Sequence, residues 1–358
     1  MIGRAAMSAF DPKRTSPHPS NIVIRPVIIA KLGVRMRRRE FLSLLGSSAA
    51  AWPLAARAQE KTDDLPRIGI LHSSPNENFE ATTEGLREAR YIDGQNVLLE
   101  KRFYGTGIDR IEAFAKDLVA LKCKVIFASA PYAIQAALKM TNRIPIVGVD
   151  LESDPISNGW AQNLARPGGN LTGLFLDLPE LGGKQIELLR KVAPRLSHLA
   201  VLWDATIGML QFRATELAAG AAKLTLQSLP IRRVDDIKSA FEEAARKQSD
   251  GLVVLSSPLI FNQRSQIADL ALGSRLPTIS IFTSFPKVGG LMAYGPNIPS
   301  MHKQAAGYIS RVLSGANPGD LPIERPSKFE LLINLKTAKA LGLAVPLLLQ
   351  QLGDEVIE

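Results

Sequence analysis

Short apolar runs alternate with longer amphipathic segments along the chain from residue 67 onward. Ten runs rich in β-branched and aliphatic residues have the length and composition of strands. They are apolar nearly throughout, as expected of parallel strands covered by helices on both faces. The predicted strands are Arg67–Leu71, Asn96–Tyr104, Lys124–Ser129, Ile144–Asp150, Leu171–Leu176, His198–Asp204, Thr225–Ile231, Gly251–Ser257, Pro277–Phe282 and Gly290–Tyr294.

Helices are predicted between these strands. In the segment from Asp109 to Leu121, apolar residues recur every three or four positions, which places them on one face of a helix. The segment from Asp235 to Gln248 has the same pattern, and Asp235 stands where an N-cap is expected. Alternation of strands and helices predicts βα units around parallel sheets.

The series of strands divides near residues 175–195, with five predicted strands on each side. Each set has the size of one doubly wound lobe, so the sequence predicts two Rossmann-like α/β lobes joined by a hinge. We expect the N-terminal lobe to cover residues 65–180 and the C-terminal lobe to cover residues 181–290. Residues 291–358 are expected to cross back and complete both lobes.

The net charge of +9 lies almost entirely in the first 58 residues, which hold ten basic and two acidic residues against 33 and 32 in the remaining 300. Residues 36–58 have the pattern of a signal peptide, with a basic cluster, an apolar stretch and small residues that place cleavage after Ala58. Arg38 and Arg39 resemble the twin-arginine type, and general secretion remains the alternative. We therefore expect a periplasmic protein. Met36 is an alternative start to Met1, with residues 1–35 as a disordered upstream extension.

Without this leader the chain is nearly neutral, which argues against nucleic-acid binding. Cys123 is the only cysteine, so no intramolecular disulfide or thiolate zinc site can form, and we expect it to be a packing residue. Nucleophile-elbow, zinc-protease and phosphate-loop motifs are absent, and the histidines are scattered. The sequence therefore predicts no catalytic residue, metal or cofactor. An exported enzyme that uses His72 with Asp150 or Asp154 as an acid–base pair is the alternative.

Polar and aromatic residues follow the predicted strands, where open α/β sheets place their ligands. Hydroxyl groups and free amides at helix N-termini favour an anionic group, and acidic side chains favour an ammonium group. Together they predict a site for a small zwitterion or another polar metabolite, although each residue alone could be an N-cap, a turn or part of the core. The candidate ligand-binding residues are Ser73, Ser74, Ser129, Tyr132, Asp150, Asp154, Trp203, Asp204, Ser256, Ser257 and Phe282.

Several stretches resemble, in the same order, the ABC-transporter substrate-binding proteins of the tryptophan/tyrosine type. These stretches are RIGILHSS, EGLREARYIDGQNV, IPIVGVDLESDP, LARPGGNLTG, GKQIELLRKVAP, LAVLWD, GGLMAYGP and KFELLINLKTAKALGL. The resemblance implies a type I periplasmic-binding fold, in which two lobes joined by three crossovers close on a small solute. It further implies that the protein delivers the solute to an inner-membrane permease. We expect a monomer without catalytic activity. A subunit that presents the closed state to a membrane sensor is the alternative.

The resemblance also bears on single residues. Ser129 or Ala130, and Asp154 with Pro155, match positions that face the solute in the amino-acid-binding members. Two features depart from the family pattern. Arg90 stands before Tyr91 where glycine is usual, and residues 150–154 are more acidic than in the aromatic-amino-acid binders, which leaves the ligand open.

Overall fold

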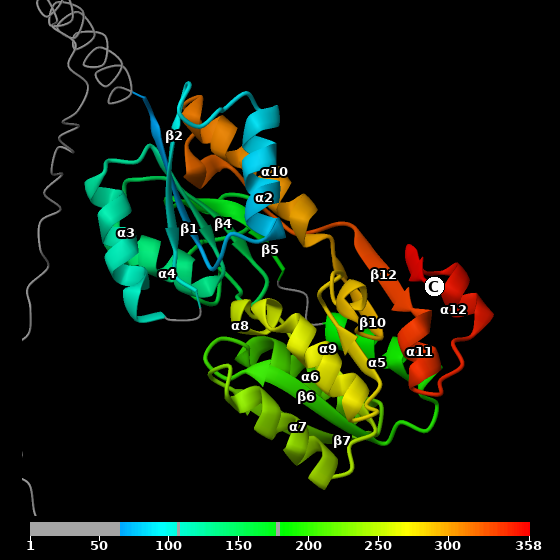
Figure 1. Cartoon of the computed structure of the whole chain (residues 1–358). Coiled ribbons are helices and arrows are strands. Elements are labelled where there is room, and N and C mark those ends of the chain that lie inside the picture. Colours follow the sequence, from blue (N-terminus) through cyan, green and yellow to red (C-terminus); the bar gives the residue numbers. More distant parts are fainter. Residues whose placement is uncertain (1–64, 106–107, 177–179) are drawn as a thin grey trace, which may run out of the picture. The chain divides into compact units, whose positions relative to one another are not determined.

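The computed structural model describes residues 65–105, 108–176 and 180–358. The predicted signal peptide at 36–58, its cleavage after Ala58 and the predicted extension at 1–35 lie outside the described residues. Among the described residues, no helix is both long and apolar enough to cross a membrane. The described elements form two sheets, each with its own covering helices (Figure 1).

The first sheet has six strands in the order β11-β5-β4-β3-β1-β2, and all its pairs are parallel. Helices α2 and α10 pack together on one face, and α3 and α4 cover the other (Figure 1). We call this sheet with its helices the first lobe. Its elements are β1 (Arg67–His72), α2 (Glu77–Glu88), β2 (Leu98–Phe103), η1 (Ile108–Arg110), α3 (Ile111–Ala120), β3 (Val125–Ser129), α4 (Pro131–Met140), β4 (Ile146–Asp150), β5 (Leu171–Phe175), α10 (Ile298–Leu313), η3 (Pro318–Asp320) and β11 (Ile323–Glu324).

The second sheet has seven strands in the order β13-β12-β10-β9-β8-β6-β7, and β12 runs antiparallel to β10. We call this sheet with its helices the second lobe. Its elements are α5 (Glu180–Val192), β6 (His198–Asp204), α6 (Met209–Ala221), β7 (Thr225–Ile231), α7 (Asp236–Arg246), β8 (Gly251–Val254), α8 (Pro258–Asn262), α9 (Arg264–Gly273), β9 (Thr278–Ser280), η2 (Pro286–Val288), β10 (Met292–Pro296), β12 (Phe329–Asn334), α11 (Leu335–Ala340), α12 (Leu347–Gln351) and β13 (Glu355–Ile357).

Both sheets repeat one strand order, which confirms the predicted pair of doubly wound lobes. Counted within each lobe, the first five strands lie in the order 2-1-3-4-5. The order reverses between β1 and β3 in the first lobe and between β6 and β8 in the second. Ligands of such sheets bind beside this switch point, at the carboxyl ends of the strands. The chain passes between the sheets three times, after β5, after β10 and after β11.

Three strands, β11, β12 and β13, were not predicted from the sequence, so the prediction of five strands in each lobe was an underestimate. β11 has two residues and β13 has three, and both depend on pairing with strands distant in the sequence. Asp235 is the N-cap residue of α7, as predicted, but its side chain does not cap the helix. Asp236 Oδ2 accepts the N–H groups of Arg232 and Arg233.

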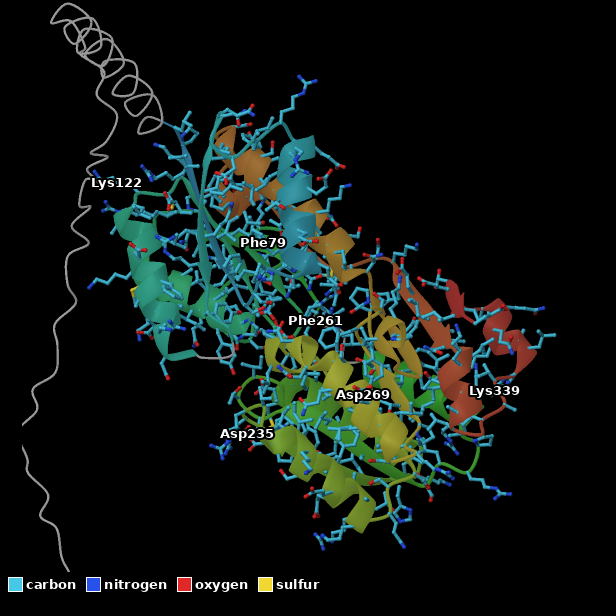
Figure 2. All side chains as sticks on the ribbon, viewed as in Figure 1. Phe79, Lys122, Asp235, Phe261, Asp269 and Lys339 are labelled. Carbon is cyan, nitrogen blue, oxygen red and sulfur yellow. The ribbon has the colours of Figure 1, made fainter. Side chains whose placement is uncertain are left out.

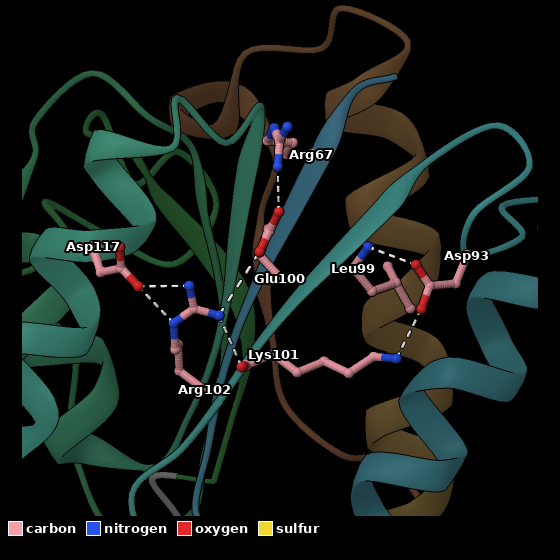
Figure 3. A network of polar contacts seen from close by, with 7 residues as sticks. All are labelled: Arg67, Asp93, Leu99, Glu100, Lys101, Arg102 and Asp117. Atoms are coloured by element: carbon pink, nitrogen blue, oxygen red, sulfur yellow. Dashed lines mark hydrogen bonds and ion pairs between the residues drawn. The ribbon is translucent and has the colours of Figure 1, made fainter. Parts of the chain in front are cut away.

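Charged side chains protect the exposed edge of the first sheet, where β2 has only one neighbour (Figure 3). Lys101 pairs with Asp93 at 2.8 Å, and Arg102 pairs with Asp117 at 2.5 Å. Glu100 pairs with Arg67 on the neighbouring strand β1. Charges on an edge strand oppose edge-to-edge aggregation, so this network belongs to the fold rather than to a ligand site.

Arg90, which stands where glycine is usual in the family, lies just after α2 in the left-handed conformation, with φ of +66°. The N–H of Arg90 bonds the carbonyl of Arg87, and the N–H of Tyr91 bonds the carbonyl of Leu86. This conformation costs a non-glycine residue about 1–2 kcal/mol, partly offset because glycine loses more backbone entropy on folding. We therefore expect Arg90→Gly to raise the free energy of unfolding by roughly 0.5–1 kcal/mol. Urea denaturation measures the change, and a loss of stability would contradict this explanation.

Candidate functional site

A polar pocket lies between the two lobes, at the carboxyl ends of their strands. It encloses about 410 Å³ of empty space, part of it open to solvent. Phe261 of α8 forms part of its wall, and Phe79 of α2 lies on the side of the first lobe (Figure 2). The residues that line this pocket are His72, Ser73, Asn76, Asn78, Ser129, Ala130, Val149, Leu151, Glu152, Ser256, Ser257, Pro258, Phe261, Phe282, Ile298 and His302.

Three buried polar atoms of the first lobe have no hydrogen-bond partner, namely His72 Nε2, Asn78 Oδ1 and Asp150 Oδ2, and the first two belong to residues that line the pocket. His72 ends β1, and its Nδ1 accepts the N–H of Ser74 at 3.3 Å. The neutral imidazole must then carry its proton on Nε2. Burial lowers the pKa of His72 to about 4. Because buried polar atoms are nearly always satisfied in folded proteins, a free donor and a free acceptor in one pocket point to a missing ligand.

His302 of α10 lies beside His72, with the ring centroids 5.4 Å apart. Its Nδ1 lies 3.0 Å from the hydroxyl of Thr82, and that hydroxyl donates to the carbonyl of Asn78. Burial, and secondarily His72, holds the pKa of His302 well below its ordinary value. Both imidazoles are therefore neutral at pH 7, and the two histidines bring no positive charge to the pocket.

Two buried carboxyl groups lie at the carboxyl end of β4, Asp150 as its last residue and Glu152 just after it. Asp150 Oδ1 accepts the N–H groups of Glu152 and Ser153 at 2.8 and 3.2 Å. Burial raises the pKa of Asp150 and raises the pKa of Glu152 strongly, and the neighbouring Asp150 charge raises the latter further. No lysine or arginine is among the pocket residues named above. A positively charged ligand group would therefore stabilise the ionised form of Glu152.

Glu152 also connects the two lobes, because its Oε1 accepts a hydrogen bond from the hydroxyl of Ser256. Beside it, Gln211 of α6 accepts the N–H of Ser256 and donates to the carbonyl of Leu151. Further links between the lobes are Ser74 to Asn262, Tyr132 to Thr206 and Arg264 to Glu77. The lobes are thus held together around the pocket.

Five of the predicted site residues line the polar pocket, namely Ser73, Ser129, Ser256, Ser257 and Phe282. Three others are not among its lining residues but have contacts near it or between the lobes. Asp150 is buried next to Glu152, and Ser74 and Tyr132 make hydrogen bonds to the second lobe. The remaining three, Asp154, Trp203 and Asp204, do not line it.

Local structure accounts for each of those three. The indole of Trp203 stacks on Phe212 at 4.5 Å in the core, and its Nε1 donates to Ser228. Asp204 accepts the N–H and the hydroxyl of Thr206 in the turn after β6. Asp154 accepts the N–H of Ile156 at 2.8 Å and the hydroxyl of Ser157. All three side chains therefore make hydrogen bonds within the fold.

Sequence reasoning did not select Asn78, Glu152, Phe261 or His302. Glu152 was noted within an acidic stretch, and its separation of two residues from Asp150 was the available signal. His302 lies 230 positions after His72, the last residue of β1. It lines the pocket because α10 belongs to the first lobe although it follows the second lobe in the sequence. No local pattern marks such a residue.

The arrangement suits binding better than catalysis or metal coordination. Within the described ranges, no hydrogen bond joins the imidazole of His72 to a carboxylate, which an acid–base pair would require. The described residues also contain no group of three or more acids, histidines or cysteines that could hold a metal ion. Cys123 is buried in the core, as predicted, and burial raises the pKa of its thiol to about 12.

Comparison with known proteins identifies relatives over nearly the whole described chain. A tyrosine-binding protein from Clostridioides difficile is 24% identical over 334 residues, which is 90% of this chain and 93% of that protein. The structure of an ABC domain from Streptococcus pneumonia in complex with L-Trp matches with a TM-score of 0.75 at 23% identity, over 82% of this chain and 100% of that one. The ligand-free, open structure of a substrate-binding protein from Clostridium difficile matches with a TM-score of 0.59 at 22% identity, over 82% of this chain and 99% of that one.

At this level of identity the two structures establish the type I periplasmic-binding fold. The sequence model of one family, the ABC transporter substrate binding proteins, extends over residues 68–357. This chain belongs to the ABC transporter substrate binding protein family.

Proposed function

We propose that this chain is the exported solute-binding component of an ABC importer, and that its ligand is an amino acid or a similar small metabolite with an ammonium group. The observation that carries the proposal is the polar pocket, in which His72 Nε2 and Asn78 Oδ1 are buried without partners. Family membership supports the transport role. The relatives that bind tyrosine or tryptophan support an amino acid as the ligand class.

The charges and hydrogen-bonding groups of the pocket residues indicate which part of the ligand each residue would contact. Glu152 faces no cationic side chain in the pocket, so it is the partner for a ligand ammonium group. His72 Nε2–H donates to a ligand oxygen, and Asn78 Oδ1 accepts from a ligand N–H group. The hydroxyls of Ser129 and Ser257 lie in the same pocket and add neutral hydrogen-bonding groups.

Binding and closure are coupled in this proposal. Residues from both lobes line the polar pocket, so a ligand contacts all of them only when the lobes are together. The closed form is what an inner-membrane permease recognises. The protein acts in the periplasm as a monomer, after cleavage of its signal peptide, and it releases the ligand chemically unchanged.

A thermal-shift screen of amino acids and small polar metabolites tests the proposal. A ligand at about 100 times its dissociation constant stabilises the folded state by about 2.7 kcal/mol, which is a shift of several degrees in Tm. We expect at least one compound with an ammonium group to produce such a shift, and to be recovered unchanged after incubation. Conversion of the compound would contradict the receptor, and a complete lack of shifts would contradict the ligand class.

A further inference from the structure

A second pocket adjoins the polar pocket at the carboxyl ends of the same two sheets. It holds about 450 Å³ of empty space, part of it open to solvent, and its wall is mainly aliphatic. We call it the apolar pocket. Most of its wall comes from Leu151, Leu176, Leu210, Ala214, Leu255 and Ile281.

The side chain of Gln211 stands between the two pockets. Gln211 lines the apolar pocket, while both of its hydrogen-bond partners, Leu151 and Ser256, line the polar pocket. Its Nε2 donates to the Leu151 carbonyl, and its Oε1 accepts the N–H of Ser256 at 3.0 Å. Leu151 lines both pockets. One glutamine side chain therefore separates the two spaces and also connects the two lobes.

The fold fixes the position of Gln211 closely. It lies in the first turn of α6, and the preceding turn is fixed by a hydrogen bond from the N–H of Gly208 to the carbonyl of Asp204. The carbonyl of Gln211 accepts the hydroxyl of Thr215 one turn later. The side chain can still change rotamer, because Gln211 is only half-buried.

We propose that Gln211 determines the size of ligand that the crevice accepts. With its bridge in place, the ligand is confined to the polar pocket. A ligand with a long apolar chain enters the apolar pocket only after the Gln211 side chain moves, which breaks both hydrogen bonds to Leu151 and Ser256. This inference rests on the proposed function, because it places the polar end of the ligand at Glu152.

Two amino acids that differ only in chain length test the inference, L-2-aminobutyrate and L-2-aminooctanoate. Each methylene group taken out of water contributes about 0.8 kcal/mol, or roughly a fourfold change in affinity. Calorimetric titration of the wild type and of Gln211→Ala gives the ratio of the two dissociation constants. We expect this ratio to move at least about tenfold in favour of aminooctanoate in Gln211→Ala, because two or more additional methylenes become buried.

Two further variants show where the chain goes. Ala214 lies one turn after Gln211 and lines the apolar pocket, whereas Ala218, on the same helix, lines a separate surface pocket with Gly183 and Arg190. Added to Gln211→Ala, Ala214→Leu should abolish the gain for aminooctanoate, and Ala218→Leu should preserve it. Melting temperatures verify that all four proteins are folded.

An unchanged ratio in Gln211→Ala would overturn the role of Gln211, as would a gain that persists when Ala214→Leu fills the pocket. Either result would leave the amino-acid receptor itself standing, because both compounds would still bind. If neither compound binds to any of the four proteins, the proposed ligand class fails, and this inference fails with it.

Discussion

Replacing Glu152 with glutamine should stabilise the ligand-free protein and nearly abolish ligand binding. Burial raises the pKa of Glu152 strongly, so the ionised carboxylate destabilises the fold at neutral pH. Glutamine keeps the shape and an oxygen that can accept from the Ser256 hydroxyl. We expect Tm of the free protein to rise by roughly 2–5 °C. Loss of a buried charge partner costs about 2–5 kcal/mol, so affinity for an ammonium ligand should fall at least about thirtyfold.

The pH dependence of this effect has a definite sign. The pKa of Glu152 is higher in the folded chain than in the unfolded chain, so the folded chain binds more protons between the two values. Its stability therefore falls as pH rises through that window. The stabilisation by Glu152→Gln should vanish below about pH 4, where both states are protonated, and become largest above the pKa of the folded state. Thermal melts of both proteins between pH 4 and pH 8 measure the difference.

The two histidines act in the opposite direction. Burial lowers the pKa of both His72 and His302, so their contribution to stability is lost as pH falls below about 6.5. Comparing the variant with the wild type at each pH cancels the histidine contribution, since both proteins contain the same imidazoles. The difference between the two melting curves therefore reports on Glu152 and on its interaction with the neighbouring Asp150.

Asp154→Asn is the matched control, because Asp154 is an acid of the same segment but lies outside the pocket. Burial alone would raise the pKa of Asp154, but hydrogen bonds from Ser157 and Ile156 lower it below the ordinary value. The control should therefore bind ligand normally and show no stabilisation of the free protein. If Asp154→Asn lost binding and Glu152→Gln kept it, the assignment of the ammonium site to Glu152 would be wrong.

Gly173→Ala should prevent the protein from folding. Gly173 of β5 lies opposite Gly148 of β4, with φ of +138°. A β-carbon at this position would lie 2.0 Å from the Gly148 carbonyl oxygen and 2.7 Å from its nitrogen. Both atoms belong to the backbone of a central strand, which cannot move without breaking the sheet. We expect a loss of at least about 4 kcal/mol, the range of exceptional single substitutions.

Gly220→Ala provides the contrast. Gly220 lies in α6, and an added β-carbon would meet nothing within 4 Å. Alanine favours the helix by about 1 kcal/mol, so this variant should be slightly more stable than the wild type. Soluble yield and urea denaturation of both variants measure the effects. A folded Gly173→Ala protein with normal stability would contradict the pairing of β4 with β5.

The lobes were predictable because buried parallel strands leave a strong local pattern. β1, β3 and β6 begin or end within one residue of the predicted runs, since each is an uninterrupted apolar segment with clear polar flanks. β11 and β13 are stable only through partners far away in the sequence, so their two or three residues leave no comparable pattern.

One family stretch, LARPGGNLTG, proved to be structural. Asn170 donates to the carbonyls of Thr141 and Ile144, and Thr172 donates to the carbonyls of Leu321 and Pro322. These bonds tie β5 to the turn before β4 and to the segment that leads into β11. A specific stretch of sequence can therefore mark a family through its crossovers and not through its ligand.

The location of the pocket was predictable, but its composition was only partly so. Strand ends in a doubly wound sheet converge, which is why Ser73, Ser129 and Ser256 line one space. The sequence does not show which way a polar side chain turns. The side chains of Asp154 and Asp204 make local hydrogen bonds, whereas Glu152, two residues before Asp154, lines the pocket.

A crystal structure of the protein with a compound from the thermal-shift screen tests the central claim most directly. The account predicts density for one ligand molecule between the two sheets, within hydrogen-bond distance of His72 Nε2 and Asn78, and with its ammonium group on Glu152. Density for the ligand elsewhere, with neither His72 Nε2 nor Glu152 in contact with it, would contradict it.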